Sequence, residues 1–214
     1  MKALARVAHE PGALEICSIP DPDPGPGEAI IAVAAAGLCV SDLEAYHQRL
    51  PSTTPLPRVP GHEFSGRIVA LGAGVEGWSV DDHVVSETAA YVCGTCALCR
   101  SGQYNLCPRR RGFGFGVDGA FAPYVRVPVR CLHRVPASLP LHLAALTEPT
   151  CVTYNAVVEK STITPGDLVV VVDPGILAGG LALPMALPIS GERAQGAVPS
   201  PACGAAGRTA AAGA

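Results

Sequence analysis

The chain has 214 residues, enough for a packed core, and its 49% hydrophobic and 15% charged residues exclude a disordered chain. The formal net charge of −3 excludes a basic surface for nucleic acid. Glycine (24) and proline (21) favour a β-rich fold with many turns over a helical bundle. The longest uncharged apolar stretch, 176–189, is too short to span a bilayer, and no targeting segment is predicted. We expect a cytoplasmic protein with no membrane or nucleic-acid partner.

The first 140 residues are typical of strands joined by turns. Short β-branched or alternating runs predict strands at 2–7, 14–19, 29–34, 65–71, 84–85 and 120–127. The proline-rich stretches at 20–27 and 51–60 predict surface loops, because proline does not fit the interior of regular elements. A short helix is predicted over 41–50, with Ser41 or Asp42 as its N-cap.

The next segment predicts a helix, a turn and a strand. Residues 141–160 have helical spacing, and Pro149 must kink this helix or start it. A Thr-Pro-Gly-Asp turn leads into the continuous valine run at 168–172, which is typical of a strand buried on both faces of a parallel sheet. Residues 174–214 are mostly Ala, Gly and Pro with no sustained helical or strand period, so we expect a disordered tail without a packed core.

Four of the nine cysteines are crowded into fifteen residues, with the spacing Cys93-x2-Cys96-x2-Cys99-x7-Cys107. An odd number of cysteines without a signal peptide favours metal binding over disulfides. Four thiolates suit a closed, tetrahedral structural zinc site. An iron–sulfur cluster is the alternative, although a bacterial ferredoxin has three residues before its last cysteine instead of seven. Four unliganded core cysteines are disfavoured by the spacing.

A second group of possible metal ligands lies upstream. Cys39 occurs in a Gly-x-Cys-x-Ser-Asp sequence that ends at Asp42, and His62 and Glu63 follow a glycine after the second proline-rich loop. Alone, each residue has an ordinary interpretation: a small core residue, a turn histidine or a helix N-cap. Together they offer a thiolate, an imidazole and a carboxylate for an open zinc site, and Asp42 could orient the His62 ring.

These motifs, in this order, resemble the zinc-dependent medium-chain dehydrogenase/reductase superfamily. With its Glu148-Pro149 pair, the chain resembles the polyol branch of this superfamily most, which includes sorbitol (iditol), butanediol and threonine dehydrogenases. The resemblance covers residues 1 to about 172. It implies a mainly β fold, in which a GroES-like, partly open β-barrel is followed by the start of a Rossmann α/β domain. The implied boundaries are 1–150 for the catalytic domain with its zinc lobe at 93–107, 151–173 for a linker helix and first strand, and 174–214 for the tail.

The resemblance also implies a site and a reaction. It assigns a catalytic zinc ion to Cys39, His62 and Glu63, and a structural zinc ion to Cys93, Cys96, Cys99 and Cys107. Ser41 is implied to relay the substrate proton. Glu148 is implied to contact zinc-bound water or substrate, or to replace Glu63 as a ligand. It implies up to two zinc ions per chain, NAD(P) as cofactor, hydride transfer from a small secondary alcohol or polyol, and a possible oligomer.

Two departures from the family pattern change these expectations. Where the family has a histidine five residues after the catalytic cysteine, this chain has Glu44. Where it has Gly-x-Gly-x-x-Gly after the first Rossmann strand, this chain reads Asp173-Pro-Gly-Ile-Leu-Ala178, so only Gly175 remains to let the backbone approach a pyrophosphate. We therefore expect a truncated chain that is inactive alone. The alternatives are a non-catalytic zinc-binding module and an iron–sulfur electron carrier.

Overall fold

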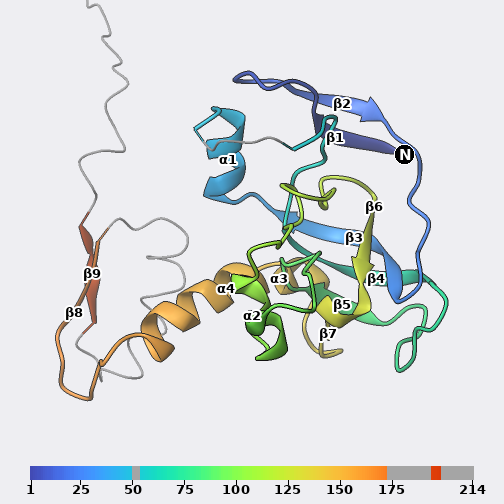
Figure 1. Ribbon diagram of the computed structural model, residues 1–214. Helices are drawn as coiled ribbons and strands as arrows, with labels where there is room; N and C mark the ends of the chain where they lie inside the picture. The colour runs from blue at the N-terminus through green and yellow to red at the C-terminus, as the bar shows by residue number, and fades with distance from the viewer. Residues whose placement is uncertain (50–53, 173–193, 199–214) are drawn as a thin grey trace, which may run out of the picture. The chain divides into compact units, whose positions relative to one another are not determined.

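The computed structural model describes residues 1–49, 54–172 and 194–198. Contacts divide the chain into two units, Met1–Glu148 and Pro149–Ala214. The described part of the chain is mostly strands, as the glycine- and proline-rich composition predicts (Figure 1). Its helices are all too short or too polar to cross a lipid bilayer.

The first unit has seven strands in its described residues. They are β1 (Lys2–Arg6), β2 (Leu14–Ser18), β3 (Glu28–Gly37), β4 (Glu63–Leu71), β5 (His83–Ser86), β6 (Tyr124–Pro128) and β7 (Leu132–Arg134). β1 and β2 pair as an antiparallel hairpin, and the others form an antiparallel five-stranded sheet in the order β6-β3-β4-β5-β7. β3 is the longest strand and bulges twice against β4. The predicted strands therefore exist, and β7 is one that the sequence did not reveal.

The main core packs against the five-stranded sheet. Its largest fully buried hydrophobic side chains are Phe113, Ile31, Ile68, Val84 and Val127. Phe113 lies edge-on to Phe64, with ring centroids 5.5 Å apart. With few aromatic residues in the chain, β-branched and small side chains supply most of the core volume, and this packing holds β4 in place at its start, where His62 and Glu63 lie.

One predicted strand is only half correct. β6 begins at Tyr124 and not at residue 120. The residues before it, Gly119, Ala120 and Phe121, donate backbone hydrogen bonds to the carbonyl groups of Val59, Gly61 and Pro60 at 2.8–3.0 Å. These bonds replace a strand ladder and fix the loop that precedes His62.

Helix α1 (Val40–Tyr46) begins earlier than predicted. Its N-cap is Cys39, so the prediction of Ser41 or Asp42 as N-cap was wrong. Asp42 instead lies in the first turn and accepts a hydrogen bond from the Cys39 backbone N–H at 3.0 Å. This bond satisfies a helix-end donor and places an anion at the positive end of the helix dipole.

The remaining helices of the first unit are single turns. They are α2 (Ala97–Arg100), the 3₁₀-helices η1 (Tyr104–Leu106) and η2 (Val129–Cys131), and α3 (Leu141–Ala144). α4 (Thr147–Tyr154) crosses the boundary between the units and continues as the π-helix η3 (Asn155–Glu159). The single helix predicted over 141–160 is thus broken before Thr147. Pro149 lies in the first turn of α4, where a missing N–H costs no intrahelical bond.

The second unit contains a parallel strand pair, β8 (Val169–Val172) and β9 (Ala194–Val198). β8 confirms the strand predicted from the valine run. Burial on both faces was wrong for this strand, because the Val170 side chain is 57% exposed. β9 lies in the segment where the sequence has no strand period, so the sequence did not predict it. Its backbone pairs with β8 in a parallel ladder. The rest of the predicted tail is outside the described residues.

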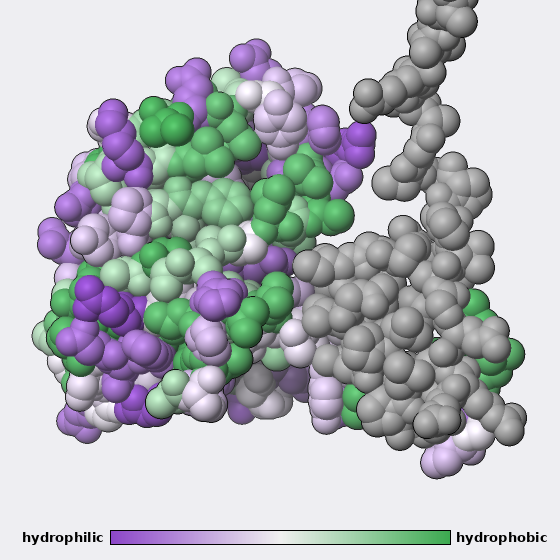
Figure 2. Space-filling view, turned by 180° about the vertical axis from the view of Figure 1, so that it is seen from behind, coloured by the Kyte–Doolittle hydropathy of each residue, from purple (hydrophilic) through white to green (hydrophobic). Residues whose placement is uncertain are grey.

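Apolar side chains also reach the surface of the first unit. Ile16, Leu38 and Val40 are 74%, 63% and 71% exposed. Figure 2 shows hydrophobic areas in green between hydrophilic ones in purple on the face that it presents. Two of these three residues flank Cys39, so one candidate metal ligand lies on an apolar part of the surface.

Candidate metal centres

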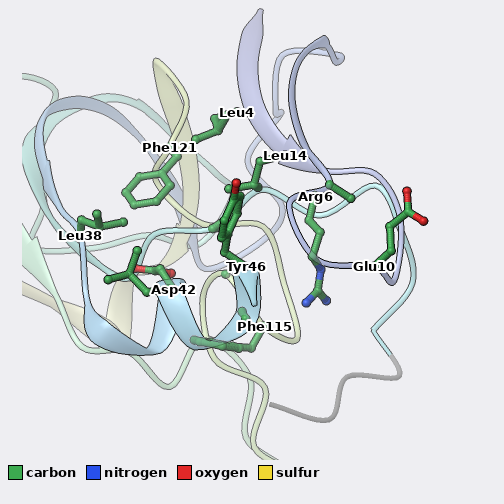
Figure 3. Close-up of a pocket in the computed structure, with 14 residues that line it drawn as sticks. Leu4, Arg6, Glu10, Leu14, Leu38, Asp42, Tyr46, Phe115 and Phe121 are labelled. Atoms are coloured by element: carbon green, nitrogen blue, oxygen red, sulfur yellow. The ribbon is translucent and has the colours of Figure 1, made fainter. Parts of the chain in front are cut away.

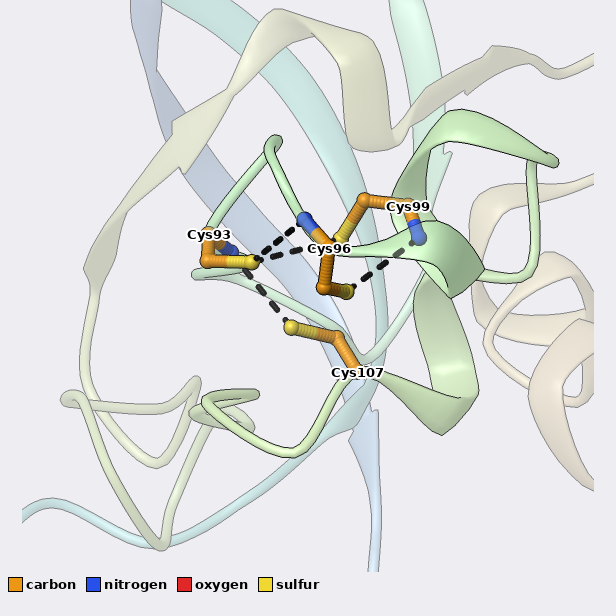
Figure 4. Close-up of side chains that lie close together, drawn as sticks. All are labelled: Cys93, Cys96, Cys99 and Cys107. Carbon is orange, nitrogen blue, oxygen red and sulfur yellow. Dashed lines mark hydrogen bonds between the residues drawn. The ribbon is translucent and has the colours of Figure 1, made fainter.

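The four clustered cysteines converge on one point. Cys96 is the N-cap of α2, Cys99 lies within α2, and Cys107 follows η1. The four Sγ atoms lie within 4.8 Å of one another, and those of Cys93 and Cys99 are 3.9 Å apart (Figure 4). All four thiols are free, so the cluster is not a disulfide pair.

Backbone N–H groups surround the sulfur atoms. The N–H of Cys96 donates to Cys93 Sγ at 3.3 Å, that of Cys99 to Cys96 Sγ at 3.4 Å, and that of Cys93 to Cys107 Sγ at 3.5 Å. The N–H of Cys96 is the main cause that lowers the pKa of Cys93 to about 5. Burial raises the pKa of Cys99 to about 12. Four sulfur atoms that converge on one point offer a closed tetrahedral ligand set, which suits zinc.

Cys39, His62 and Glu63 form the second cluster. Their ligand atoms lie within 4.8 Å of one another. The fold brings them together, because Cys39 precedes α1 whereas His62 and Glu63 come after the second proline-rich loop. His62 and Glu63 are buried at the start of β4, and Cys39 is half-buried at the start of α1. Gly37 pairs with Glu63 across the β3–β4 ladder, and a Cβ at Gly37 would overlap the Glu63 carboxylate. A side chain at position 37 would therefore displace the Glu63 carboxylate from this ligand group.

Asp42 lies behind the His62 ring. Asp42 Oδ1 is 3.8 Å from His62 Nδ1, which is too long for a hydrogen bond, and Nδ1 has no hydrogen-bond partner among the described residues. With Nδ1 on the Asp42 side, Nε2 is left as the ligand atom. Burial alone would lower the pKa of His62, but the hydrogen bond with Cys39 and the negative charges of Asp42, Cys39 and Glu148 raise it overall.

Glu148 and Ser41 lie around the same cluster. Burial raises the pKa of the Glu148 carboxyl, and the charge of Glu63 adds to this effect, while His62 and Arg110 oppose it. A cavity of about 430 Å³ is lined by both residues, with His62 on its wall. Its other lining residues are Thr54, Thr88, Arg110, Arg111, Gly112, Phe113, Phe115 and Gly116. The structure thus brings together Ser41, His62 and Glu148, which the resemblance assigned to one site.

Sequence reasoning missed the side of this cavity formed by Thr88, Arg110 and Arg111. The one signal was the run of three arginines at 109–111, which begins two residues after the last cysteine of the cluster. Gly175, the predicted pyrophosphate contact, lies outside the described residues.

A second cavity of about 300 Å³ is lined partly by residues of α1 and is mainly apolar. Figure 3 shows Leu14, Leu38, Tyr46, Phe115 and Phe121 around it, with Asp42 among them. None of Cys39, His62 and Glu63 lines it, so it is separate from the candidate metal cluster.

Residues 25–137 match the alcohol dehydrogenase GroES-like domain family. The chain is 45% identical over 175 residues to a sorbitol dehydrogenase of Halalkalibacterium halodurans, an overlap of 82% of this chain and 50% of the relative. It is 35% identical over 175 residues to a D-arabitol-phosphate dehydrogenase of Enterococcus avium, with 82% and 49% covered. The chain spans about half the length of these curated relatives.

Solved structures give the same result. A zinc-binding dehydrogenase from Sinorhizobium meliloti, bound to NADP, superposes with a TM-score of 0.81 at 29% identity, covering 92% of this chain and 55% of that one. Galactitol-1-phosphate dehydrogenase from Escherichia coli gives a TM-score of 0.78 at 28% identity, covering 91% and 54%. The predicted fold class and the resemblance are confirmed, and the chain belongs to the zinc-dependent medium-chain dehydrogenases with a GroES-like domain.

Proposed function

We propose that this chain supplies the zinc-binding catalytic part of a dehydrogenase that oxidises a secondary alcohol or polyol with NAD(P). The observation that carries the proposal is the cluster of Cys39, His62 and Glu63 beside a cavity lined by Ser41 and Glu148. One thiolate, one imidazole and one carboxylate are the mixed ligand set of an open zinc site. The sorbitol and arabitol-phosphate dehydrogenases among its relatives support a polyol as substrate.

Zinc at this cluster would act as a Lewis acid on the substrate hydroxyl, and a nicotinamide would accept the hydride. The residues of the chain do the positioning. Cys39, His62 and Glu63 are the proposed ligands, and Asp42 holds both ends of this set, through the Cys39 N–H and beside the His62 ring. The four-cysteine cluster is proposed to bind a second, structural zinc.

Proton transfer is assigned to Ser41. Its hydroxyl has no hydrogen-bond partner among the described residues, so it can accept a hydrogen bond from a substrate hydroxyl in the cavity and pass its own hydrogen on to solvent as the substrate proton arrives. Glu148, half-buried on the same wall, can accept a hydrogen bond from the substrate or serve as a further ligand.

We further propose that the 214 residues do not complete turnover on their own and that the protein is cytoplasmic. The support for inactivity is the sequence after β8, where Asp173 and Ala178 replace two glycines of the dinucleotide fingerprint. A Cβ and a negative charge at that turn disfavour a pyrophosphate.

Cobalt substitution tests the catalytic proposal without requiring turnover. Cobalt(II) in both clusters gives thiolate-to-metal absorption, and adding sorbitol should shift only the bands of the open site. Cys39→Ser should abolish the shift, whereas Cys99→Ser should leave it. Cobalt bound by the four cysteines alone, with no response to any polyol or simple alcohol, would contradict the proposal. NADH formation in the same samples tests the expected inactivity separately.

A further inference from the structure

We propose that the cavity beside the Cys39/His62/Glu63 cluster selects polyols that carry an anionic end group, a phosphate monoester or a carboxylate, and that Arg110 and Arg111 bind this group. The inference rests on the proposed function and specifies its substrate class. It concerns the part of the cavity lining that the loop after η1 contributes.

The two arginines are held in place by their neighbours. Arg110 Nη2 donates to Thr88 Oγ1 at 2.8 Å, which anchors one corner of its guanidinium on the cavity wall. Arg111 pairs its backbone with Tyr91 through two hydrogen bonds of 3.0 and 2.9 Å, and its guanidinium lies 5.3 Å from the centre of the Tyr91 ring. Both residues line the cavity, together with His62 and Glu148.

Neither arginine is part of a salt bridge within the described ranges, whereas Arg49, Arg58, Arg67, Arg126 and Arg134 each are. The charge of Arg110 acts on the carboxyl of Glu148, which lines the same cavity. The chain as a whole carries a net charge of −3, so two cations outside any salt bridge on one small cavity do not follow from a basic composition. A guanidinium presents several N–H groups in a planar fork that matches the oxygens of a phosphate or carboxylate.

Further donors accompany the guanidinium groups. In the described part of the chain, the backbone N–H of Gly112 donates to no protein acceptor, and the hydroxyl hydrogen of Thr88 has none either. Both residues line the cavity. Two cations, an amide N–H and a hydroxyl on one wall form a donor set for an oxyanion, whereas the hydroxyl groups of a neutral polyol would use at most part of it.

The cavity has room for such a substrate. Its volume of about 430 Å³ falls in the range of ligand pockets, roughly 300–1,000 Å³. Ser41, His62 and Glu148 line it and would contact the reacting hydroxyl, and Arg110 and Arg111 also line it and would contact the oxyanion. A substrate with a hydroxyl at one end and an oxyanion at the other would contact both groups of residues.

Isothermal titration of the full, zinc-loaded chain tests the inference. The ligands are a pentitol phosphate, the neutral pentitol, the corresponding aldonate and inorganic phosphate. We expect the pentitol phosphate or the aldonate to bind at least about tenfold more tightly than the neutral pentitol, as charge-assisted hydrogen bonds imply. Arg110→Gln should remove most of this advantage and Arg110→Lys part of it, so that the ratio of the two affinities falls toward one. Arg67→Gln, which removes the same charge from an exposed ion pair with Asp81, should change nothing.

The outcomes separate the two proposals. Equal binding of charged and neutral pentitols by zinc-loaded protein overturns the inference and leaves the proposed function intact. Inorganic phosphate that binds as tightly as the pentitol phosphate, or an equal loss in Arg67→Gln, also overturns it. If Arg110→Gln weakens the binding of NADP but not that of the pentitol phosphate, the inference is overturned and the arginines belong to the cofactor site. Protein that loads zinc only on the four cysteines and binds no polyol counts against the proposed function itself.

Discussion

The buried carboxylate of Asp42 lies 3.8 Å from Nδ1 of His62, while its second oxygen accepts the backbone N–H of Cys39 at 3.0 Å. One side chain in the first turn of α1 therefore contacts the residue that starts the helix and faces the ring that precedes β4. A change at this carboxylate should affect both candidate ligands at once.

Asp42→Asn and Asp42→Ala should both weaken zinc binding at the Cys39/His62/Glu63 cluster by about 10- to 100-fold, because residues that orient metal ligands contribute this much. Alanine should also lower the free energy of unfolding by about 1 kcal/mol, since the Cys39 N–H loses its acceptor. Competition with a chromophoric chelator and urea unfolding measure the two effects. Asp81→Asn, on an exposed ion pair, is the control. Unchanged zinc affinity in Asp42→Ala would refute the orienting role.

Cys99→Ser should remove one zinc equivalent and lower the melting temperature by about 10 °C or more. A closed four-thiolate site contributes directly to folding, and 1 kcal/mol corresponds to roughly 2–4 °C in a domain of this size. Metal analysis and thermal unfolding give the readouts. Cys151→Ser makes the same chemical change at an exposed cysteine outside both clusters and should have neither effect. Bound iron in the wild-type protein, or a stable fold without metal, would contradict the zinc assignment.

The convergence of the four cysteines was predictable because their spacing is a local pattern. Two-residue gaps between Cys93, Cys96 and Cys99 allow successive sulfurs to face one point in a single turn of chain, and the structure has them there. The strands at the hairpin and sheet were predictable for the same reason, since alternation is a short-range pattern.

The missed features depend on contacts between distant segments. Residues 120–123 have strand character, but the N–H groups of Ala120 and Phe121 donate to the loop at 59–61 instead of to a strand. Cys39 is an unusual N-cap, and it caps α1 because Asp42 reaches back to its N–H. Arg110 and Arg111 line the same cavity as His62 only once the chain has folded, and no local sequence spacing indicates this proximity.

Asp82→Asn should destabilise the protein above about pH 4, with an effect that disappears in acid. The hydrogen bond from Arg134 at 2.7 Å is the main cause that lowers the pKa of the Asp82 carboxyl in the folded state, and the Ser79 N–H assists. A lowered carboxyl pKa gives stability that is present above the unfolded value and is lost as the pH falls through the folded one. Thermal unfolding of both proteins from pH 7 to pH 2.5 should therefore show converging melting temperatures. A constant difference across this range would exclude the ionic contribution.

Chelation should remove the two proposed zinc ions in separate phases. Cys99 and Cys107 are only 4% and 5% exposed and their sulfurs lie among N–H donors, whereas Cys39 is half-buried beside a cavity that opens to ligands. A mild chelator should reach the Cys39/His62/Glu63 site first, because an open site has a position for an incoming ligand and a closed tetrahedral one does not. Zinc release followed with a fluorescent indicator should show one fast and one slow equivalent. Cys39→Ser should eliminate the fast phase and Cys99→Ser the slow one. Release of both ions in one phase, or a fast phase that persists in Cys39→Ser, would show that the two clusters do not differ as open and closed sites.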